Sequence, residues 1–214
     1  GIDVGTTAAK AVLLSKAGIV PLKSVYKYNL IKENNGEILQ DPEDWYKAVC
    51  TLCRSCSKSL PGDGRITAIA FSTQGGSLVL TDENGMNKGM AISWMDTRGK
   101  TEGLDKEALL RKTGWGADGN LVLCQLRRMR DEAPDIFNDA CKVLTTADYL
   151  AMRLTGRAVI DSTNAAMTQL ADYRKGMWDA ELCSEAGIDE KMLPELLSAG
   201  EIIGPLTERA LADT

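Results

Sequence analysis

The first fourteen residues, Gly1–Leu14, read GIDVGTTAAKAVLL and predict the start of the fold. A short apolar strand leads into a tight turn, and a second strand of alternating character leaves it. Gly5 allows the backbone to turn where a Cβ would clash. Thr6 and Thr7 offer hydroxyl and backbone N–H donors at the tip, which are the donors that a phosphate group needs. The stretch therefore predicts a strand–turn–strand unit that binds phosphate.

Asp3 stands just before this turn, where a carboxylate can hold Mg²⁺ through water. Magnesium prefers one or two carboxylates together with several waters and phosphate oxygens. The stretch is not a Walker loop, because no Gly-Lys-Ser/Thr precedes a helix. Taken alone, the motif is short, and the alternative is a plain hairpin in which Asp3 caps the turn.

Composition restricts the classes of function. The net charge of −5 disfavours nucleic acid and anionic membranes as partners, and no apolar run approaches the roughly 20 residues of a membrane span. Histidine is absent, so Ser-His-Asp and Cys-His catalysis and HExxH zinc sites are excluded. The sequence carries no secretory leader and starts without Met inside a strand pattern. We therefore expect a cytoplasmic protein whose first residues precede Gly1.

Three of the six cysteines form the pattern Cys50-x-x-Cys53-x-x-Cys56. One interpretation is a ligand set for an iron–sulfur cluster or a metal. However, the strongly helical segment 41–49 leads directly into the pattern, and no fourth cysteine lies nearby. We favour free thiols on a helix, which fit a reducing compartment.

Turn and capping signals divide the rest of the chain. Asp41 and Pro42 are typical of a helix start, and Glu43 and Asp44 complement the helix dipole. Three consecutive antiparallel strands followed by alternating strands and helices indicate an α/β fold with a mixed sheet. The further expected elements are a third strand at 19–28, a helix from Pro42 to about Ser59, a buried strand at 65–72, strands at 78–81 and 90–94, and mainly helices from there to 214.

Several separated motifs resemble the FGGY family of carbohydrate kinases. The opening resembles the first phosphate loop of the actin, Hsp70 and sugar-kinase superfamily. LQDPEDW at 39–45 is similar to the family's helix start, AFSTQGGSLVLTD at 70–82 to its Ser-x-Gln substrate loop, and AISWMDTR at 91–98 to its Trp-x-Asp-x-Arg segment. Further similar blocks follow in the family's order at 146–156, 161–165, 178–179, 193–194 and 203–206.

This resemblance implies a ribonuclease H-like fold with a mixed five-stranded sheet, flanking helices and a helical insertion. It implies that residues 1–214 are most of an N-terminal domain, and that a C-terminal, adenosine-binding domain is absent from the chain. The implied activity is ATP-dependent phosphorylation of a sugar or polyol hydroxyl, with Mg²⁺ as cofactor. The catalytic base would be an Asp beyond Thr214, so we expect the chain alone to be inactive. Self-association into a homodimer is left open.

For the nucleotide, the resemblance implies that Gly5, Thr6, Thr7 and Lys10 contact the phosphates of ATP and that Asp3 orients Mg²⁺. The alternative for the threonines is hydrogen bonding within the turn, and the alternative for Lys10 is a solvated strand face.

For the sugar, the resemblance implies that Gln74 hydrogen-bonds a hydroxyl. Many relatives carry larger side chains where Gly75 and Gly76 stand, including a Met-His pair in xylulose kinases. The glycines open room or expose backbone N–H groups, and they disfavour xylulose as the substrate.

The Trp-x-Asp-x-Arg segment completes the implied pocket. Trp94 would form a wall, Asp96 would accept bonds from sugar hydroxyls, and Arg98 would fix Asp96 or bind the substrate. The alternatives are core packing for Trp94 and a surface salt bridge for the other two.

Three rival functions remain. An actin- or Hsp70-like ATPase shares the opening loop but not the Ser-x-Gln and Trp-x-Asp-x-Arg blocks. An iron–sulfur activator ATPase would use the cysteine pattern, and a non-catalytic module would bind sugar without transferring phosphate. The sugar itself is open among pentuloses, hexuloses, gluconate, glycerol and tetritols.

Overall fold

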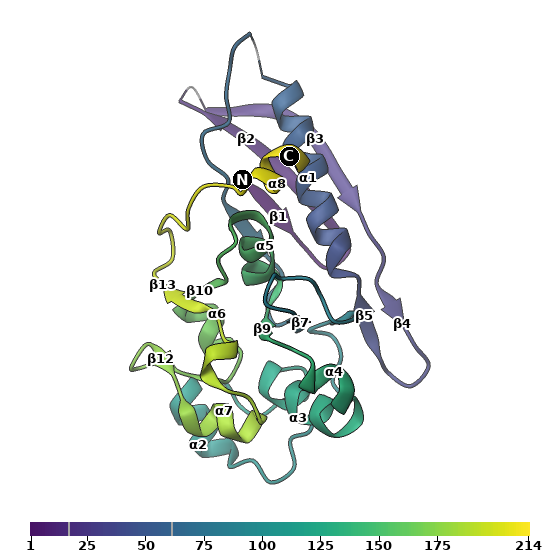
Figure 1. The fold of residues 1–214 in the computed structure, drawn as a ribbon, viewed down its shortest axis with the longest axis vertical. Coiled ribbons are helices and arrows are strands. Elements are labelled where there is room, and N and C mark those ends of the chain that lie inside the picture. Colours follow the sequence, from purple (N-terminus) through teal and green to yellow (C-terminus); the bar gives the residue numbers. More distant parts are fainter. Residues whose placement is uncertain (17, 61) are drawn as a thin grey trace.

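The main sheet is built by the first three strands and one later strand (Figure 1). The computed structural model describes residues 1–16, 18–60 and 62–214. The predicted run of three antiparallel strands is confirmed, and the fourth strand joins it in parallel. In spatial order the strands are β3 (Gly18–Lys27), β2 (Ala8–Ser15), β1 (Ile2–Val4) and β6 (Phe71–Thr73).

Helix α1 (Pro42–Lys58) covers one face of this sheet. Its predicted start is confirmed: the Asp41 side chain accepts the N–H of Glu43 at 2.9 Å, and proline occupies the first turn. Strand side chains alternate between the two faces, so Ile2 and Val4 are buried on the helix side while Asp3 is exposed on the other.

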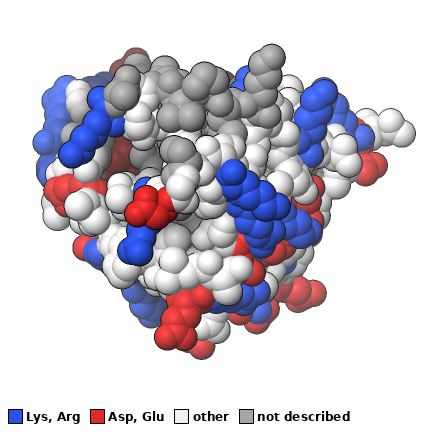
Figure 2. Space-filling view, turned by 90° about the horizontal axis from the view of Figure 1, so that it is seen from above, with Lys and Arg blue, Asp and Glu red and all other residues white. Residues whose placement is uncertain are grey.

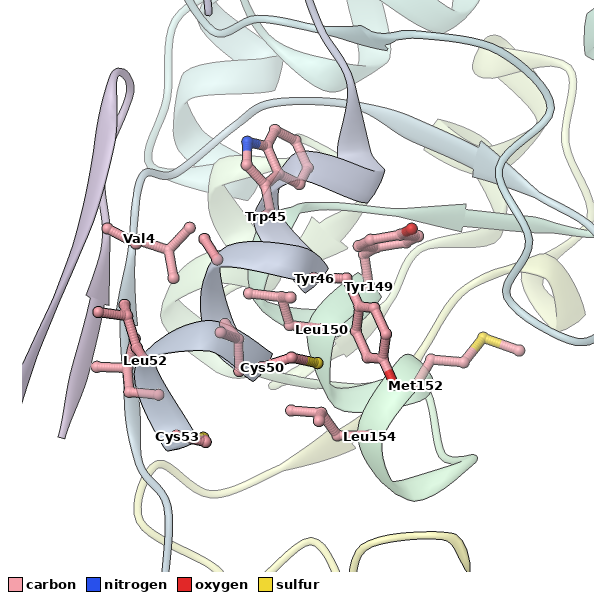
Figure 3. Close-up of a cluster of buried hydrophobic side chains, with 14 of the residues drawn as sticks. Val4, Trp45, Tyr46, Cys50, Leu52, Cys53, Tyr149, Leu150, Met152 and Leu154 are labelled. Atoms are coloured by element: carbon pink, nitrogen blue, oxygen red, sulfur yellow. The ribbon is translucent and has the colours of Figure 1, made fainter. Parts of the chain in front are cut away.

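The core between sheet and helix is closed by helix α5 (Thr146–Thr155) (Figure 3). Val4, Trp45 and Tyr149 are fully buried there, and the rings of Trp45 and Tyr149 meet edge to face with centroids 6.2 Å apart. Truncating a buried tryptophan typically costs about 3–5 kcal/mol. This cluster therefore holds β1, and the turn that follows it, in place.

Beside this core, the buried guanidinium group of Arg153 links α5 to α1, and Tyr46 of α1 in turn bonds a third helix. Arg153 of α5 stacks on the rings of Tyr46 and Tyr149 and pairs with Glu43 of α1. The Tyr46 hydroxyl donates to Asp213 of α8 (Glu208–Asp213) at 2.9 Å. Removing one member of such a pair leaves a buried charge without compensation.

The expected sheet differs from the observed one in two respects. The described residues form a four-stranded main sheet rather than a five-stranded one. The buried strand expected at 65–72 is wrong over 65–70, where the chain is irregular and Arg65, Thr67 and Ala68 are exposed. Only β6 is extended and paired, because its ladder partner β1 offers three residues.

The strands expected at 78–81 and 90–94 exist but pair outside the main sheet. β7 (Val79–Thr81) pairs with β9 (Lys142–Leu144), and β8 (Ala91–Ile92) pairs with β5 (Ile38–Gln40). The later half is mainly helical, as expected, around a second apolar cluster. The short strand β4 (Ile31–Lys32) precedes β5 in the first half. The remaining elements of the later half are α2 (Lys106–Thr113), α3 (Val122–Glu132), α4 (Pro134–Asn138), β10 (Val159–Asp161), α6 (Ser162–Met167), β11 (Ala171–Asp172), β12 (Met177–Trp178), α7 (Ala180–Ala186), η1 (Glu190–Met192) and β13 (Glu195–Leu197).

Cys50, Cys53 and Cys56 are buried free thiols on α1. Burial raises the pKa of Cys53 to about 11, so its thiol stays protonated at neutral pH. Within the described residues, no group of three or more His, Cys, Asp and Glu side chains is placed to hold a metal ion. The cysteines therefore act as core residues.

The surface carries charges of both signs. Figure 2 shows Lys and Arg side chains interspersed with Asp and Glu around the face that it presents. In the described part of the chain, none of the helices has the length and apolarity needed to cross a membrane.

The buried carboxyl of Asp148 gives folding a pH dependence that can be measured. It accepts the Thr145 N–H at 2.7 Å in the capping box of α5, and burial raises its pKa to about 7. In the unfolded chain the pKa is about 3.9. Between these values the folded state holds the extra proton, so stability falls as pH rises from 4 to 7.

We expect urea unfolding to show a loss on the order of 1–3 kcal/mol across that range. Asp148→Asn keeps an acceptor for Thr145 and removes the titrating group, so its unfolding free energy should change less with pH. The other carboxyl groups also titrate at the acid end of this range, but both proteins share them, so the difference between the two pH slopes reports Asp148. Identical pH slopes in the two proteins would show that Asp148 is ionised throughout.

Candidate phosphate and substrate site

Tyr28 and Gln40 fix the turn between β1 and β2 by donating hydrogen bonds to its carbonyl groups. The Tyr28 hydroxyl donates to the Gly5 carbonyl, and the Tyr28 N–H donates to the Thr7 carbonyl at 3.2 Å. Gln40 Nε2 donates to the Thr6 carbonyl at 2.7 Å. Burial, with Asp3 nearby, raises the pKa of Tyr28, so its hydroxyl remains a donor at neutral pH. All three carbonyls of the turn are thus bound by the protein.

The amide groups of the same turn are left available. The Gly5 N–H closes the turn on the Ala8 carbonyl at 3.0 Å. The N–H groups of Thr6 and Thr7 donate to no acceptor within the described residues. Consecutive unpaired backbone N–H groups form an anion-binding arrangement. The turn is therefore suited to hold phosphate oxygens.

Asp3 and Lys10 lie beside the turn as register partners across β1 and β2. Both are exposed on the sheet face opposite α1, and both line a hollow of about 390 Å³. Neither has an ion-pair partner among the residues that the structure describes. A carboxylate and an ammonium group are thus both available at this edge of the sheet.

Gln74 lies at the same edge because β6 runs parallel to β1. Ligands of α/β sheets bind beyond the carboxyl ends of such strands. The Gln74 N–H donates to the Val4 carbonyl at 2.8 Å, and its Nε2 donates to Gln40 Oε1 at 2.8 Å. Its Oε1 is buried and has no hydrogen-bond partner among the described residues.

The two glycines that follow pass between α6 and Trp94. A Cβ on Gly75 would stand 2.4 Å from Cε of Met167, and one on Gly76 would stand 3.6 Å from the Trp94 Cβ. Gly76 also has φ +75°, which favours glycine. The space that the missing Gly75 side chain was expected to leave open is therefore filled by Met167, which lies far from Gly75 in the sequence.

Trp94 stands over the phosphate turn. Its Nε1 donates to Thr6 Oγ1 at 3.1 Å, and its backbone N–H donates to Ser77 Oγ at 3.2 Å. The side chain is 39% exposed, so it is not a core residue. The structure thus brings Trp94 against Thr6, and Gln40 links Thr6 to Gln74.

Asp96 and Arg98 lie behind this group rather than at its open surface. Asp96 is fully buried; it accepts the Ile38 N–H at 3.2 Å and several bonds from Arg98, the shortest 2.7 Å from Nη2. Burial alone would raise the pKa of Asp96, but the bonds from Arg98 and Ile38 lower it, so the carboxylate stays charged. Arg98 also bonds Glu37 at 2.9 Å. This geometry supports a positioning role for the pair and is not the surface salt bridge considered as the alternative.

Comparison with known proteins shows the family of this chain. Residues 1–214 match the N-terminal domain of the FGGY family of carbohydrate kinases. The chain belongs to this family. A xylulose kinase of Staphylococcus xylosus is 29% identical over 98% of this chain, and a gluconokinase of Bacillus subtilis is 30% identical over 94%. The crystal structure of a gluconate kinase from Lactobacillus acidophilus superposes on the whole chain with a TM-score of 0.92 at 28% identity.

The chain spans less than half of each of these FGGY proteins: 44% of the xylulose kinase, 40% of the gluconokinase and 44% of the crystal structure. The solved neighbours confirm the ribonuclease H-like α/β fold expected for this family.

Sequence reasoning missed Gln40, Tyr28 and Met167 in this FGGY domain. Gln40 lies within the motif at 39–45, whose resemblance to the family indicates only a helix start. One signal was available: a glutamine in a β pattern immediately before the Asp41 cap must either be exposed or find partners, and it is 1% exposed. Met167 carries no such signal, because its contact with Gly75 is formed only by the tertiary fold.

Removal of the Asp96 carboxylate tests the positioning role. Asp96→Ala would leave the Ile38 N–H unpaired and Arg98 with Glu37 alone, which should cost about 2–4 kcal/mol of unfolding free energy. Glu37→Gln breaks only the outer, half-exposed bond, and should cost less than about 1 kcal/mol. Denaturation in urea measures both. An Asp96→Ala protein of normal stability would contradict the positioning role.

Proposed function

We propose that this chain supplies the phosphate-binding and sugar-binding half of an ATP-dependent sugar or polyol kinase. One observation carries the proposal. The turn holds two N–H groups, and the adjoining substrate loop an amide oxygen, that have no partner among the described residues, and Trp94 bonds both the turn and the loop. The names of the relatives, which include xylulose kinase, gluconokinase and glycerol kinase, support the same class of reaction. The buried free thiols fit a cytoplasmic enzyme.

Phosphoryl transfer requires in-line positioning, neutralisation of charge and a base for the attacking hydroxyl. In this proposal the Thr6 and Thr7 N–H groups hold the terminal phosphates of ATP, and Lys10 neutralises part of their charge. Gln74 and Trp94 hold and orient the sugar beside them. The two subsites share the Thr6 residue, so they present both reactants at one edge of the sheet.

The residues present fit a magnesium ion. Asp3 offers one exposed carboxylate that has no ion-pair partner in the described part of the chain, and Mg²⁺ usually keeps several waters beside one or two carboxylates. When bound with ATP, Mg²⁺ neutralises charge on the transferring phosphoryl group. In this proposal Asp3 holds it through water.

The base and the adenosine site are proposed to lie outside residues 1–214. The chain covers less than half of its relatives, and no histidine is available within it. A carboxylate from the remainder of the enzyme is the base that this reaction would use. Closure of the two parts would exclude water from the site.

A substrate panel tests this proposal directly. The intact enzyme should release ADP with at least one of a pentulose, a hexulose, gluconate, glycerol and a tetritol, above its rate without acceptor. Residues 1–214 alone should release none, because the base is missing. Turnover by the isolated chain, purified free of host kinases, would overturn the division of roles.

The role of Asp3 is tested in the intact enzyme. Asp3→Ala should lower kcat by about 100-fold or more, because metal and phosphates lose their anchor, while the sugar Kd stays nearly constant. Asp63→Ala, in the exposed turn after α1, is the matched control and should leave kcat unchanged. Near-normal kcat in Asp3→Ala would show that this carboxylate does not anchor the metal or the phosphates.

A further inference from the structure

We infer that Gln40 is a positioning residue that fixes the polarity of the Gln74 amide and makes Gln74 Oε1 a hydrogen-bond acceptor for a substrate hydroxyl. This inference rests on the proposed function and adds a specificity rule to it. Gln40 touches neither reactant in the proposal, yet it contacts both of the loops that do.

The polarity follows from the chemistry of the contacts. The Thr6 carbonyl can only accept, so Gln40 must direct its Nε2 toward it, at 2.7 Å. The Oε1 of Gln40 then faces Gln74 and can only accept as well. Gln74 must therefore offer its own Nε2, at 2.8 Å. The Thr6 carbonyl thus fixes the orientation of the Gln40 amide, and the Gln40 amide in turn fixes that of Gln74.

Gln40 is rigid enough to transmit this orientation. It is 1% exposed and lies on β5, where it pairs with Ala91 of β8. The next residue, Asp41, caps α1, so the backbone is fixed on both sides. A rotation of the Gln40 amide would place two carbonyl oxygens against each other at Thr6 and two NH₂ groups against each other at Gln74.

The last group in this chain of hydrogen bonds is the Gln74 amide oxygen, which has no donor among the described residues. Gln74 Oε1 is buried without a partner in the described part of the chain, which leaves the cost of removing it from water uncompensated. A donor from a ligand would remove that cost. Sugars and polyols offer hydroxyl donors, whereas a keto oxygen or a deoxy position offers none. The geometry therefore predicts that Gln74 selects for a hydroxyl at one position of the substrate.

The same amide ties the sugar subsite to the phosphate turn. Gln40 holds the Thr6 carbonyl, while Trp94 holds the Thr6 hydroxyl at 3.1 Å. Loss of the Gln40 amide would free both Thr6 and Gln74. We therefore expect effects on sugar KM and on kcat together, although Gln40 contacts no reactant.

The experiment compares deoxy analogues in the intact enzyme. The substrate is the panel member with the highest kcat/KM, tested beside each of its monodeoxy analogues. Wild-type enzyme should lose at least tenfold in kcat/KM for one analogue. Gln40→Met keeps the length of the side chain without its amide, and should lower kcat/KM for the parent sugar about tenfold or more. The discrimination against that analogue should shrink to less than threefold.

Further variants complete the design. Gln40→Glu still offers an acceptor to Gln74 Nε2 but loses the amide donor to the Thr6 carbonyl, so it should keep the discrimination while kcat falls. If Gln40→Met does not fold, the same ratio measured in Gln40→Leu decides. Gln169→Met removes another fully buried glutamine amide, which bonds the Gly116 carbonyl and neither Thr6 nor Gln74. It should lower Tm while the discrimination ratio stays at the wild-type value.

The possible failures are distinct. An intact enzyme that phosphorylates no member of the panel would refute the proposed function itself. An active enzyme in which a folded Gln40 variant keeps wild-type kcat and wild-type discrimination between hydroxyl and deoxy substrates would overturn the role of Gln40. Equal loss of discrimination in Gln169→Met would also overturn it, because general loosening would then explain the effect.

Discussion

The hydrogen bonds of the short strand β5 determine how the loops of the site are arranged. The Ile38 N–H binds the Asp96 carboxylate, and the Ser93 N–H binds the Ile38 carbonyl at 2.9 Å. Two residues later, Gln40 binds the phosphate turn and the substrate loop. These groups are buried or half-buried, so each would pay a desolvation cost if its partner moved away. Three loops that are distant in sequence are therefore restricted to one mutual arrangement.

The apolar core supplies the fixed platform on which this network acts. Val4 is packed beneath α1 with Trp45 and Tyr149, and the alternation of strand side chains then places Asp3 on the opposite, exposed face. A register slip by one residue would bury Asp3 and expose Val4. The energy that holds the core together thus also keeps the carboxylate beside the phosphate turn and accessible to solvent.

Local patterns were sufficient for part of the fold and of the site. The opening strand–turn–strand unit and the start of α1 follow from turn and capping chemistry within a few residues, and the structure has both. The strand expected at 65–72 was too long, because its length depends on a ladder partner that local composition does not reveal. The burial of Asp96 depends on Ile38, 58 positions away in sequence, so its motif indicated importance but not the positioning role. Gln40 was overlooked for a similar reason, because its partners belong to two other loops.

The substrate loop shows how far a motif can be trusted for specificity. Two adjacent glycines suggest an enlarged pocket when only residues 70–82 are considered. In the folded domain the Met167 thioether occupies the position that a Gly75 side chain would take, and Trp94 borders Gly76. A methionine side chain is unbranched and adapts readily to what it contacts. The shape available to a sugar is therefore set jointly by the loop and by α6, and the identity of the loop residues alone does not determine which sugar fits.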